Sequence, residues 1–185
     1  MVNNTKSKAQ YYIGLMSGTS LDGLDVCIVK FSGRGITTVY GHTFSLPDSM
    51  PEEILAICQG QQLTLPQLGE LDHKIGRFHA ACVNQALQQA NLTSAAIIAI
   101  GSHGQTIFHQ PSGKHPFTLQ IGDANIIAAS TGITTVADFR RMDMAYGGQG
   151  APLVPAFHQA IFSHPTTATV VLNIGGIANI TVLRP

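Results

Sequence analysis

The sequence predicts a mixed α/β fold in which helices cover a sheet, and three observations lead to it. Residues 11–16, 26–31 and 37–46 are rich in aliphatic and β-branched residues and are punctuated by glycines, which predicts the three strands of an antiparallel meander. Residues 68–86 carry apolar side chains every three or four positions, as a helix packed on a sheet does. Residues 95–101 form a continuous apolar run that is typical of a buried parallel strand. This order of elements indicates stacked layers of sheet and helix.

Capping signals predict where the first two helices begin. Ser49-Met-Pro-Glu52 offers a capping box with proline in the first turn, and it predicts a short helix that runs to about Cys58. Thr64-Leu-Pro-Gln67 offers a second box, which opens the long helix. The stripe that this helix turns toward the sheet consists of Leu68, Leu71, Ile75, Phe78, Cys82 and Ala86.

The remaining elements alternate between strand and helix. Residues 115–121 predict a strand, and Asp123 is placed to cap a helix that ends near Ser130. A further strand is expected over residues 134–137, followed by a long irregular stretch over 138–152 of the kind that often carries function. A helix over residues 154–162 then leads to a second β-hairpin that ends at Leu183.

Composition excludes several function classes. The chain has 185 residues, of which 44% are apolar and 11% charged, and its formal net charge is zero. This composition argues against disorder and gives no electrostatic footprint for nucleic acid or an anionic membrane. No apolar run reaches the roughly 18 residues that span a bilayer, and the polar N-terminus lacks the apolar stretch of a signal peptide. Three widely spaced cysteines form neither a disulfide framework nor a zinc pattern, so we expect a reducing, cytoplasmic compartment.

The segment Gly18–Asp25 joins two apolar runs and predicts a hairpin tip rich in backbone groups. Glycine lets such a tip approach a phosphate closely because no Cβ intervenes, and turn amides form an anion-binding concavity. The hydroxyls of Thr19 and Ser20 add donors. The carboxylates of Asp22 and Asp25 can face a phosphate only through a cation, which indicates magnesium. The alternative is an ordinary turn supported by Asp-Gly, and no Walker Gly-Lys-Ser/Thr sequence is present.

A similar segment, Asn173–Asn179, lies near the other end of the chain. Asparagines here take the place of the hydroxyls, since asparagine tolerates left-handed turn geometry and donates hydrogen bonds. We expect Asn173, Gly175 and Gly176 to form a second phosphate-binding tip, and the pair of hairpins to act as a clamp. An ordinary turn is again the alternative.

The cluster Gly101–Thr106 directly follows the predicted buried strand. Ligands of open α/β sheets bind just beyond the carboxyl ends of strands. The cluster offers compact polar side chains that suit sugar hydroxyls: Ser102, His103, Gln105 and Thr106. A structural turn, with His103 satisfied inside the fold, is the alternative.

The segment Asp138–Asp143 also follows a predicted strand and contains two arginines. An arginine can bind a carboxylate or phosphate through two parallel hydrogen bonds. An ion pair with the aspartates of the same segment is the alternative. No Gly-x-Ser-x-Gly sequence supports a hydrolase triad, and the spacing of the histidines fits no metal pattern.

Together these segments resemble one family, the anhydro-N-acetylmuramic acid kinases. The similarity covers nearly the whole chain after residue 10 and is far more specific than a single glycine motif. The matching segments are Gly14–Asp25, Gly101–Thr106, Leu119–Gly122, Val136–Arg141, Gly147–Pro155 and Leu172–Gly176.

The resemblance implies an actin-like (ribonuclease H-like) fold and an ATP- and Mg²⁺-dependent sugar kinase of peptidoglycan recycling and amino-sugar catabolism. Such enzymes open the 1,6-anhydro ring of anhydro-N-acetylmuramic acid with water and phosphorylate O6. In these terms the ATP-binding residues are Gly18, Thr19, Ser20, Leu21, Asp22, Gly23, Leu24 and Asp25, with Asn173, Gly175 and Gly176 on the second tip. The substrate-binding residues are Ser102, His103, Gln105, Thr106 and Arg141, with Arg141 near the lactyl carboxylate. The magnesium ligands are Asp22 and Asp25.

One departure from the family pattern concerns the catalytic base. Members are much longer than this chain, and their base is an aspartate in a Phe-Asp-x-Gly-Pro-Gly-Asn segment past the second hairpin. The resemblance therefore places the base beyond Pro185 and no catalytic residue in this chain. We expect a flexible N-terminus over 1–10, a first lobe over 11–165 and the opening hairpin of a truncated second lobe over 166–185. The isolated chain is expected to be inactive and its last hairpin to expose an apolar edge.

Two other function classes stay open. A nucleotide-binding switch module has the same kind of fold, but it does not need the polar cluster Ser102–Thr106. A non-catalytic dimerising lobe would suit the low charge content. The resemblance itself implies a homodimer for the full-length parent, with a small sugar and ATP as ligands and no nucleic acid or membrane partner.

Overall fold

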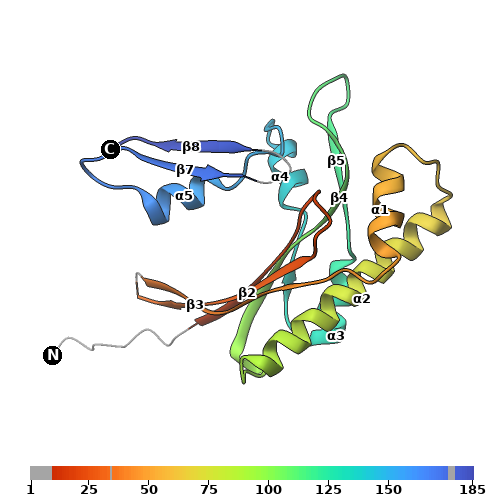
Figure 1. Cartoon of the computed structure of the whole chain (residues 1–185), viewed down its shortest axis with the longest axis horizontal. Helices are drawn as coiled ribbons and strands as arrows, with labels where there is room; N and C mark the ends of the chain where they lie inside the picture. Colours follow the sequence, from red (N-terminus) through yellow and green to blue (C-terminus); the bar gives the residue numbers. More distant parts are fainter. Residues whose placement is uncertain (1–9, 34, 175–177) are drawn as a thin grey trace. The chain divides into compact units, whose positions relative to one another are not determined.

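The computed structural model describes residues 10–33, 35–174 and 178–185, and these residues form two compact units (Figure 1). The first unit contains the described residues up to His109 together with Leu119–Asp138, and the second contains Gln110–Thr118 and Phe139–Pro185. We describe each unit by itself. The two units are not the lobes predicted from the sequence, whose boundary at residue 165 stays a prediction. The predicted flexible N-terminus lies almost wholly outside the described residues.

The first unit is built on a mixed sheet in the order β3-β2-β1-β4-β5, with β6 also paired to β4. The predicted meander is confirmed, because β1 pairs antiparallel with β2 and β2 pairs antiparallel with β3. Strands β4 and β6 supply the parallel part of the sheet, since β4 runs parallel to β1 and β6 runs parallel to β4. The strands are β1 Gln10–Ser17, β2 Leu24–Ser32, β3 Gly35–Phe44, β4 Ile97–Gln110, β5 Phe117–Ile121 and β6 Thr135–Val136.

The core of this unit lies between the sheet and two helices, α2 (Leu65–Gln89) and α3 (Ala124–Thr131), which run side by side in Figure 1. Alternate residues of the first two strands, such as Leu15 and Val26, point to the same side and pack with Val83 of α2. The predicted helical stripe is confirmed: Leu71, Ile75, Cys82 and Ala86 are buried, and Leu68 and Phe78 are half-buried. A second cluster joins Ile54 of α1 (Met50–Cys58) to the sheet.

The predicted capping box at the start of α2 is confirmed. The backbone amide of Gln67 donates to the Thr64 hydroxyl at 3.5 Å, and the Thr64 amide donates to the Gln67 side-chain oxygen at 2.9 Å. Two amide donors at the helix start, which have no partner within the helix, are satisfied in this way.

Replacing Thr64 by alanine is expected to lower the free energy of unfolding by about 1 kcal/mol, because the helix loses its cap. Chemical denaturation checks this value. Thr64→Ser keeps the hydroxyl and serves as the matched control. Equal losses in the two variants would show that the hydroxyl bond to Gln67 does not stabilise the helix start.

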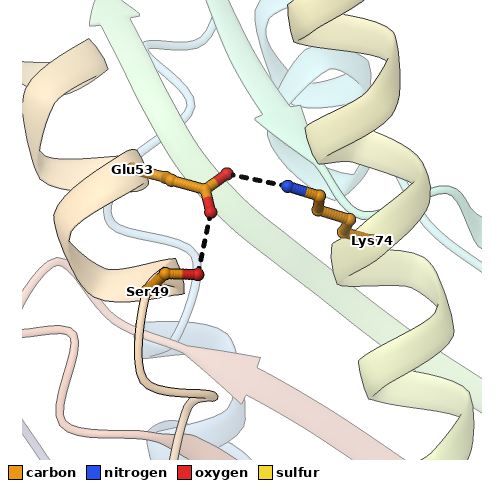
Figure 2. Close-up of polar contacts among 3 residues, drawn as sticks. All are labelled: Ser49, Glu53 and Lys74. Atoms are coloured by element: carbon orange, nitrogen blue, oxygen red, sulfur yellow. Dashed lines mark hydrogen bonds and ion pairs between the residues drawn. The ribbon is translucent and has the colours of Figure 1, made fainter.

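The capping box predicted at Ser49 is wrong. Ser49 has α-helical backbone angles, and its side chain caps no backbone amide. Its hydroxyl instead donates to a carboxylate oxygen of Glu53 at 3.0 Å, and the other Glu53 oxygen accepts from Lys74 of α2 at 3.1 Å (Figure 2). Proline already occupies the first turn and has no amide to satisfy. Glu53 therefore links the start of α1 to α2 across a solvent-exposed ion pair.

The second unit contains two helices and a two-stranded sheet: α4 Phe139–Ala145, α5 Pro155–Phe162, β7 Thr169–Asn173 and β8 Asn179–Leu183. The stretch predicted as irregular over residues 138–152 therefore contains a short helix. The predicted hairpin is confirmed, with Val170 opposite Val182 and Leu172 opposite Ile180. All four of these side chains are exposed, so one side of the hairpin presents a continuous apolar face.

Two further observations concern membrane spans and cysteines. Among the described residues, no helix is both long enough and apolar enough to pass through a membrane. All three cysteines are free thiols. Burial raises the pKa of the Cys82 thiol to about 12, which makes this thiol unreactive.

Candidate functional site

The first predicted phosphate tip is the turn between β1 and β2. The Leu21 amide donates to the Gly18 carbonyl at 3.4 Å, and the Ser20 hydroxyl donates to Asp22 at 2.8 Å. The side chains of Thr19 and Ser20 are exposed. A Cβ added at Gly23 would lie 2.7 Å from the carbonyl oxygen of Phe44, so only glycine lets the tip lie this close to β3. The tip has the glycine-rich backbone that was predicted for it.

The two aspartates predicted as magnesium ligands are both exposed. Asp25, at the start of β2, accepts a hydrogen bond from the Thr43 hydroxyl at 2.5 Å, and Asp22 accepts from Ser20. Each carboxylate keeps further lone pairs that suit a hard cation. No cluster of three metal-binding side chains exists within the described residues. Two exposed carboxylates are oxygen donors of the type that magnesium takes alongside phosphate and water oxygens.

The polar cluster Gly101–Thr106 was predicted to follow a buried strand. In the structure it instead forms the middle of β4. The glycines suggested a turn, yet the strand continues past both of them. Gly104 has a φ of +67°, and a Cβ on it would lie 2.7 Å from the carbonyl oxygen of Ile121 in β5. The second glycine therefore permits a kink and a close approach of β5 rather than a chain reversal.

The side chains of this cluster differ in exposure. Ser102 is 0% exposed and Gln105 is 1% exposed, whereas His103 and Thr106 are half-buried. The Thr106 hydroxyl accepts from the Gln120 amide at 3.1 Å, and His103 Nδ1 lies 2.8 Å from the Gly104 carbonyl. His103 and Thr106 are therefore the members of the cluster that a ligand can reach in this conformation. A sugar-binding role for all four residues stays a prediction.

A buried histidine on α2 was missed by the sequence reasoning. His79 is 1% exposed, and neither ring nitrogen has a hydrogen-bond partner among the described residues. Burial, together with the nearby charge of His103, lowers the pKa of His79 to about 4. A signal existed, because His79 lies four residues after Ile75 on the buried stripe of the helix.

The two arginines of the second unit have different environments. Arg140 is half-buried and donates to the Gly150 carbonyl at 2.6 Å, while Asp143 accepts from the Gly150 amide at 2.8 Å. Burial lowers the pKa of Arg140. Arg140 and Asp143 thus hold the loop after α4, whereas the side chain of Arg141 is exposed. Arg141 belongs to the second unit and the polar cluster of β4 to the first.

The second predicted tip is only partly described. Asn173 and Asn179 are paired at the ends of β7 and β8, and both are exposed. Gly175 and Gly176, which were predicted to contact phosphate, lie outside the described residues. The middle of β8 is held to α5 by a hydrogen-bond contact of 3.0 Å between His158 Nδ1 and the Thr181 hydroxyl.

A meander continued by parallel strands, with a glycine-rich tip between the first two strands, is the arrangement of an actin-like α/β lobe, a fold that sugar kinases share with nucleotide-binding switch proteins. Comparison with known proteins agrees. The profile of the anhydro-N-acetylmuramic acid kinase family matches residues 10–185. The chain belongs to this family.

Several curated relatives carry the name anhydro-N-acetylmuramic acid kinase. That of Pasteurella multocida is 54% identical over 180 residues, which is 97% of this chain and 48% of the relative. One from Vibrio vulnificus is 54% identical over 179 residues, with the same two shares. One from Vibrio parahaemolyticus is 54% identical over 176 residues, which is 95% of this chain and 48% of the relative. The chain thus spans about half the length of the curated relatives it matches.

Proposed function

We propose that the complete protein carrying this sequence is an ATP-dependent kinase of 1,6-anhydro-N-acetylmuramic acid. Water adds to C1, the C1–O6 bond breaks, and O6 takes the γ-phosphoryl group, so that N-acetylmuramic acid 6-phosphate and ADP are formed. The observation that carries the proposal is the 54% identity to a curated kinase of this name over an alignment that covers 97% of the chain. The reaction belongs to peptidoglycan recycling and amino-sugar catabolism in the cytoplasm.

The first hairpin tip would bind the phosphates of ATP. Its exposed Thr19 hydroxyl and its backbone amides are donors of the kind that phosphate oxygens accept, and the Ser20 hydroxyl would join them on turning from Asp22. Magnesium, when bound with ATP, neutralises phosphate charge, and Asp22 and Asp25 would hold it through one carboxylate oxygen each or through water. Asn173, together with Gly175 and Gly176, stays a proposed phosphate-binding segment.

We propose sugar-binding roles for His103 and Thr106 of β4 and, independently of these, for Arg141 of α4. His103 and Thr106 offer half-buried polar groups for hydroxyls. The exposed guanidinium of Arg141 suits the lactyl carboxylate, since the two planar groups can form two parallel hydrogen bonds. Ser102 and Gln105 are buried, so a sugar does not reach them in this conformation.

The test of the proposal is ADP release on incubation of the complete protein with ATP, Mg²⁺ and 1,6-anhydro-N-acetylmuramic acid. We expect turnover with this sugar, a product of the mass of N-acetylmuramic acid 6-phosphate, and little turnover with 1,6-anhydro-N-acetylglucosamine, which lacks the lactyl carboxylate. In Arg141→Lys the KM for the sugar is expected to rise about tenfold, because lysine cannot form the paired hydrogen bonds. No release of ADP with the anhydro sugar would overturn the assignment.

A polypeptide of these 185 residues alone is expected to show no measurable turnover. The family's Phe-Asp-x-Gly-Pro-Gly-Asn segment does not occur in them, and a positioned base contributes roughly 10²–10⁴-fold in rate.

We also propose that the complete protein is a homodimer, supported by exposed apolar side chains such as Phe157 and Ile161 of α5. Light scattering at micromolar concentration checks this, and a monomeric mass would contradict it.

A further inference from the structure

Gln105 of β4 is buried, and both the oxygen and the nitrogen of its side-chain amide form hydrogen bonds within the first unit. Its oxygen accepts a hydrogen bond from the Ser17 hydroxyl at 2.6 Å. Its nitrogen lies within donor range of two backbone carbonyls, those of Gly18 at 3.4 Å and Thr106 at 3.2 Å. With 1% of its surface exposed, this amide has little room for a ligand and instead joins β4 to the first hairpin tip.

The pairing of β1 with β4 brings these groups together. Leu15 lies opposite Ser102, but Ser17 lies opposite Gln105, so β4 contains one more residue than β1 over this interval. Such a bulge re-aims a side chain. Here it sets Gln105 directly beside the last residue of β1, where the tip begins.

The contacts of Gln105 reach both sides of the tip. The Ser17 hydroxyl, which donates to Gln105, also lies 3.3 Å from the carbonyl of Gly23, where the tip ends. A hydroxyl has one proton, and the shorter distance favours its donation to Gln105. Ser17 is itself 2% exposed, so the whole link is shielded from water.

The bond to Gly18 has a consequence for the direction of the next amide. In a planar trans peptide the carbonyl and the following N–H point in opposite directions. When Gln105 holds the Gly18 carbonyl toward the interior of the sheet, the N–H of Thr19 is turned away from that interior. Thr19 is an exposed residue, so by this geometry its N–H is directed to the solvent side of the tip.

We propose that Gln105 is a positioning residue for ATP: it fixes the Ser17–Gly18 corner so that the tip amides face the nucleotide's phosphates. This inference rests on the proposed function and deepens it, because it moves Gln105 from the sugar-binding group to the nucleotide side. The ligand class is a nucleoside triphosphate, and Gln105 acts on it through the backbone of Gly18 and Thr19.

The test measures KM for ATP and for the anhydro sugar separately in the complete protein, together with ATP binding by calorimetry without sugar. Gln105→Met keeps the volume of the side chain and removes both hydrogen-bonding functions. We expect its KM and Kd for ATP to rise about tenfold, with the KM for the sugar changed less than twofold. Ser17→Ala, which removes the partner hydroxyl, is expected to shift the same ATP parameters severalfold.

Thr131→Val is the matched control. Thr131 is 7% exposed, lies in the same unit, and uses its hydroxyl in buried hydrogen bonds to Ile127 and Ile133. This variant loses a buried hydrogen-bonding group far along the chain from the tip, so its KM for ATP is expected to stay at the wild-type value. An equal rise in the control would show that the effect of Gln105→Met is a general loss of stability.

The outcomes separate the inference from the proposed function. The positioning role is overturned if the KM for the sugar rises and the KM for ATP does not. It is also overturned if neither Gln105→Met nor Ser17→Ala changes ATP binding. If Gln105→Met does not fold, the result for Ser17→Ala decides. Absence of sugar phosphorylation by the wild-type protein overturns the proposed function, while calorimetry still reports whether Gln105 supports ATP binding. A wild-type protein that binds no ATP overturns both.

Discussion

Replacing Gly104 by alanine is expected to lower the free energy of unfolding of the first unit by about 3 kcal/mol. Two costs add. The residue has a φ of +67°, where an L side chain costs about 1–2 kcal/mol. The new Cβ would also lie 2.7 Å from the carbonyl oxygen of Ile121, a backbone atom that cannot rotate away. Overpacking of this kind typically costs a further 1–3 kcal/mol. Denaturant titration of the variant and the wild-type protein checks the sum.

Gly132→Ala separates the two costs. Gly132 has a similar φ of +71°, but a Cβ on it would meet nothing within 4 Å. This control is therefore expected to lose only about 1 kcal/mol, the cost of the left-handed backbone. Equal losses at the two positions would mean that β5 does not approach Gly104 as closely as the structure has it.

The behaviour of Gly104 also explains why the sequence predicted β4 incorrectly. Glycines that lie next to polar residues, as Gly101 and Gly104 do, are typical of turns. The buried strand was therefore expected to end at Gly101. The strand instead continues to Gln110, because its glycine backbone lets it pair with a strand on each side. Gly104 admits the backbone of β5, and a bulge between Ser102 and Gln105 shifts the register with β1 by one residue while pairing continues. These requirements come from neighbouring strands, and a local pattern carries no record of them.

Where a structure depends on local chemistry, the sequence predicted it well. The meander, the stripe of α2 and the Thr64 capping box follow from periodicity and from hydrogen bonds between residues three positions apart. The Ser49 box failed although its pattern is similar. There a partner on another helix, Lys74, engages the carboxylate of Glu53, which binds the Ser49 hydroxyl. A contact from outside the segment therefore decides whether the Ser49 hydroxyl caps a backbone amide or binds the Glu53 carboxylate.

The candidate site shows the same division. The glycine-rich hairpin turn was predicted correctly from its own residues, and its role in binding phosphate stays a prediction. The division of the β4 cluster into buried and half-buried members was not predicted, because alternation along β4 is interrupted by the bulge. Gln105 and Ser102 have the composition of ligand-binding residues and the burial of core residues. Only the packing of β1 and α2 against β4 shows that these two residues belong to the core and not to a ligand-binding surface.

The second large effect is a loss of stability on acidification, caused by His79. Its pKa in the folded protein is about 4, below the value of 6.5 for a free histidine, because burial disfavours the charged ring. Between these two values the unfolded chain binds a proton that the folded chain does not. Stability from this group is therefore complete above pH 6.5 and falls as the pH drops toward 4. The expected loss between pH 7 and pH 4 is about 3 kcal/mol.

His79→Leu isolates this contribution from that of the carboxylates, which also titrate at low pH. Leucine fills a similar space and cannot be protonated, so the variant is expected to lose about 3 kcal/mol less than the wild-type protein over the same interval. Its free energy of unfolding at pH 7 is expected to rise as well, since two buried ring nitrogens without partners are removed. His73→Leu, on an exposed position of the same helix, leaves His79 in place and should keep the wild-type acid sensitivity. Parallel curves for His79→Leu and wild type between pH 7 and pH 4 would mean that the fold does not keep this imidazole neutral.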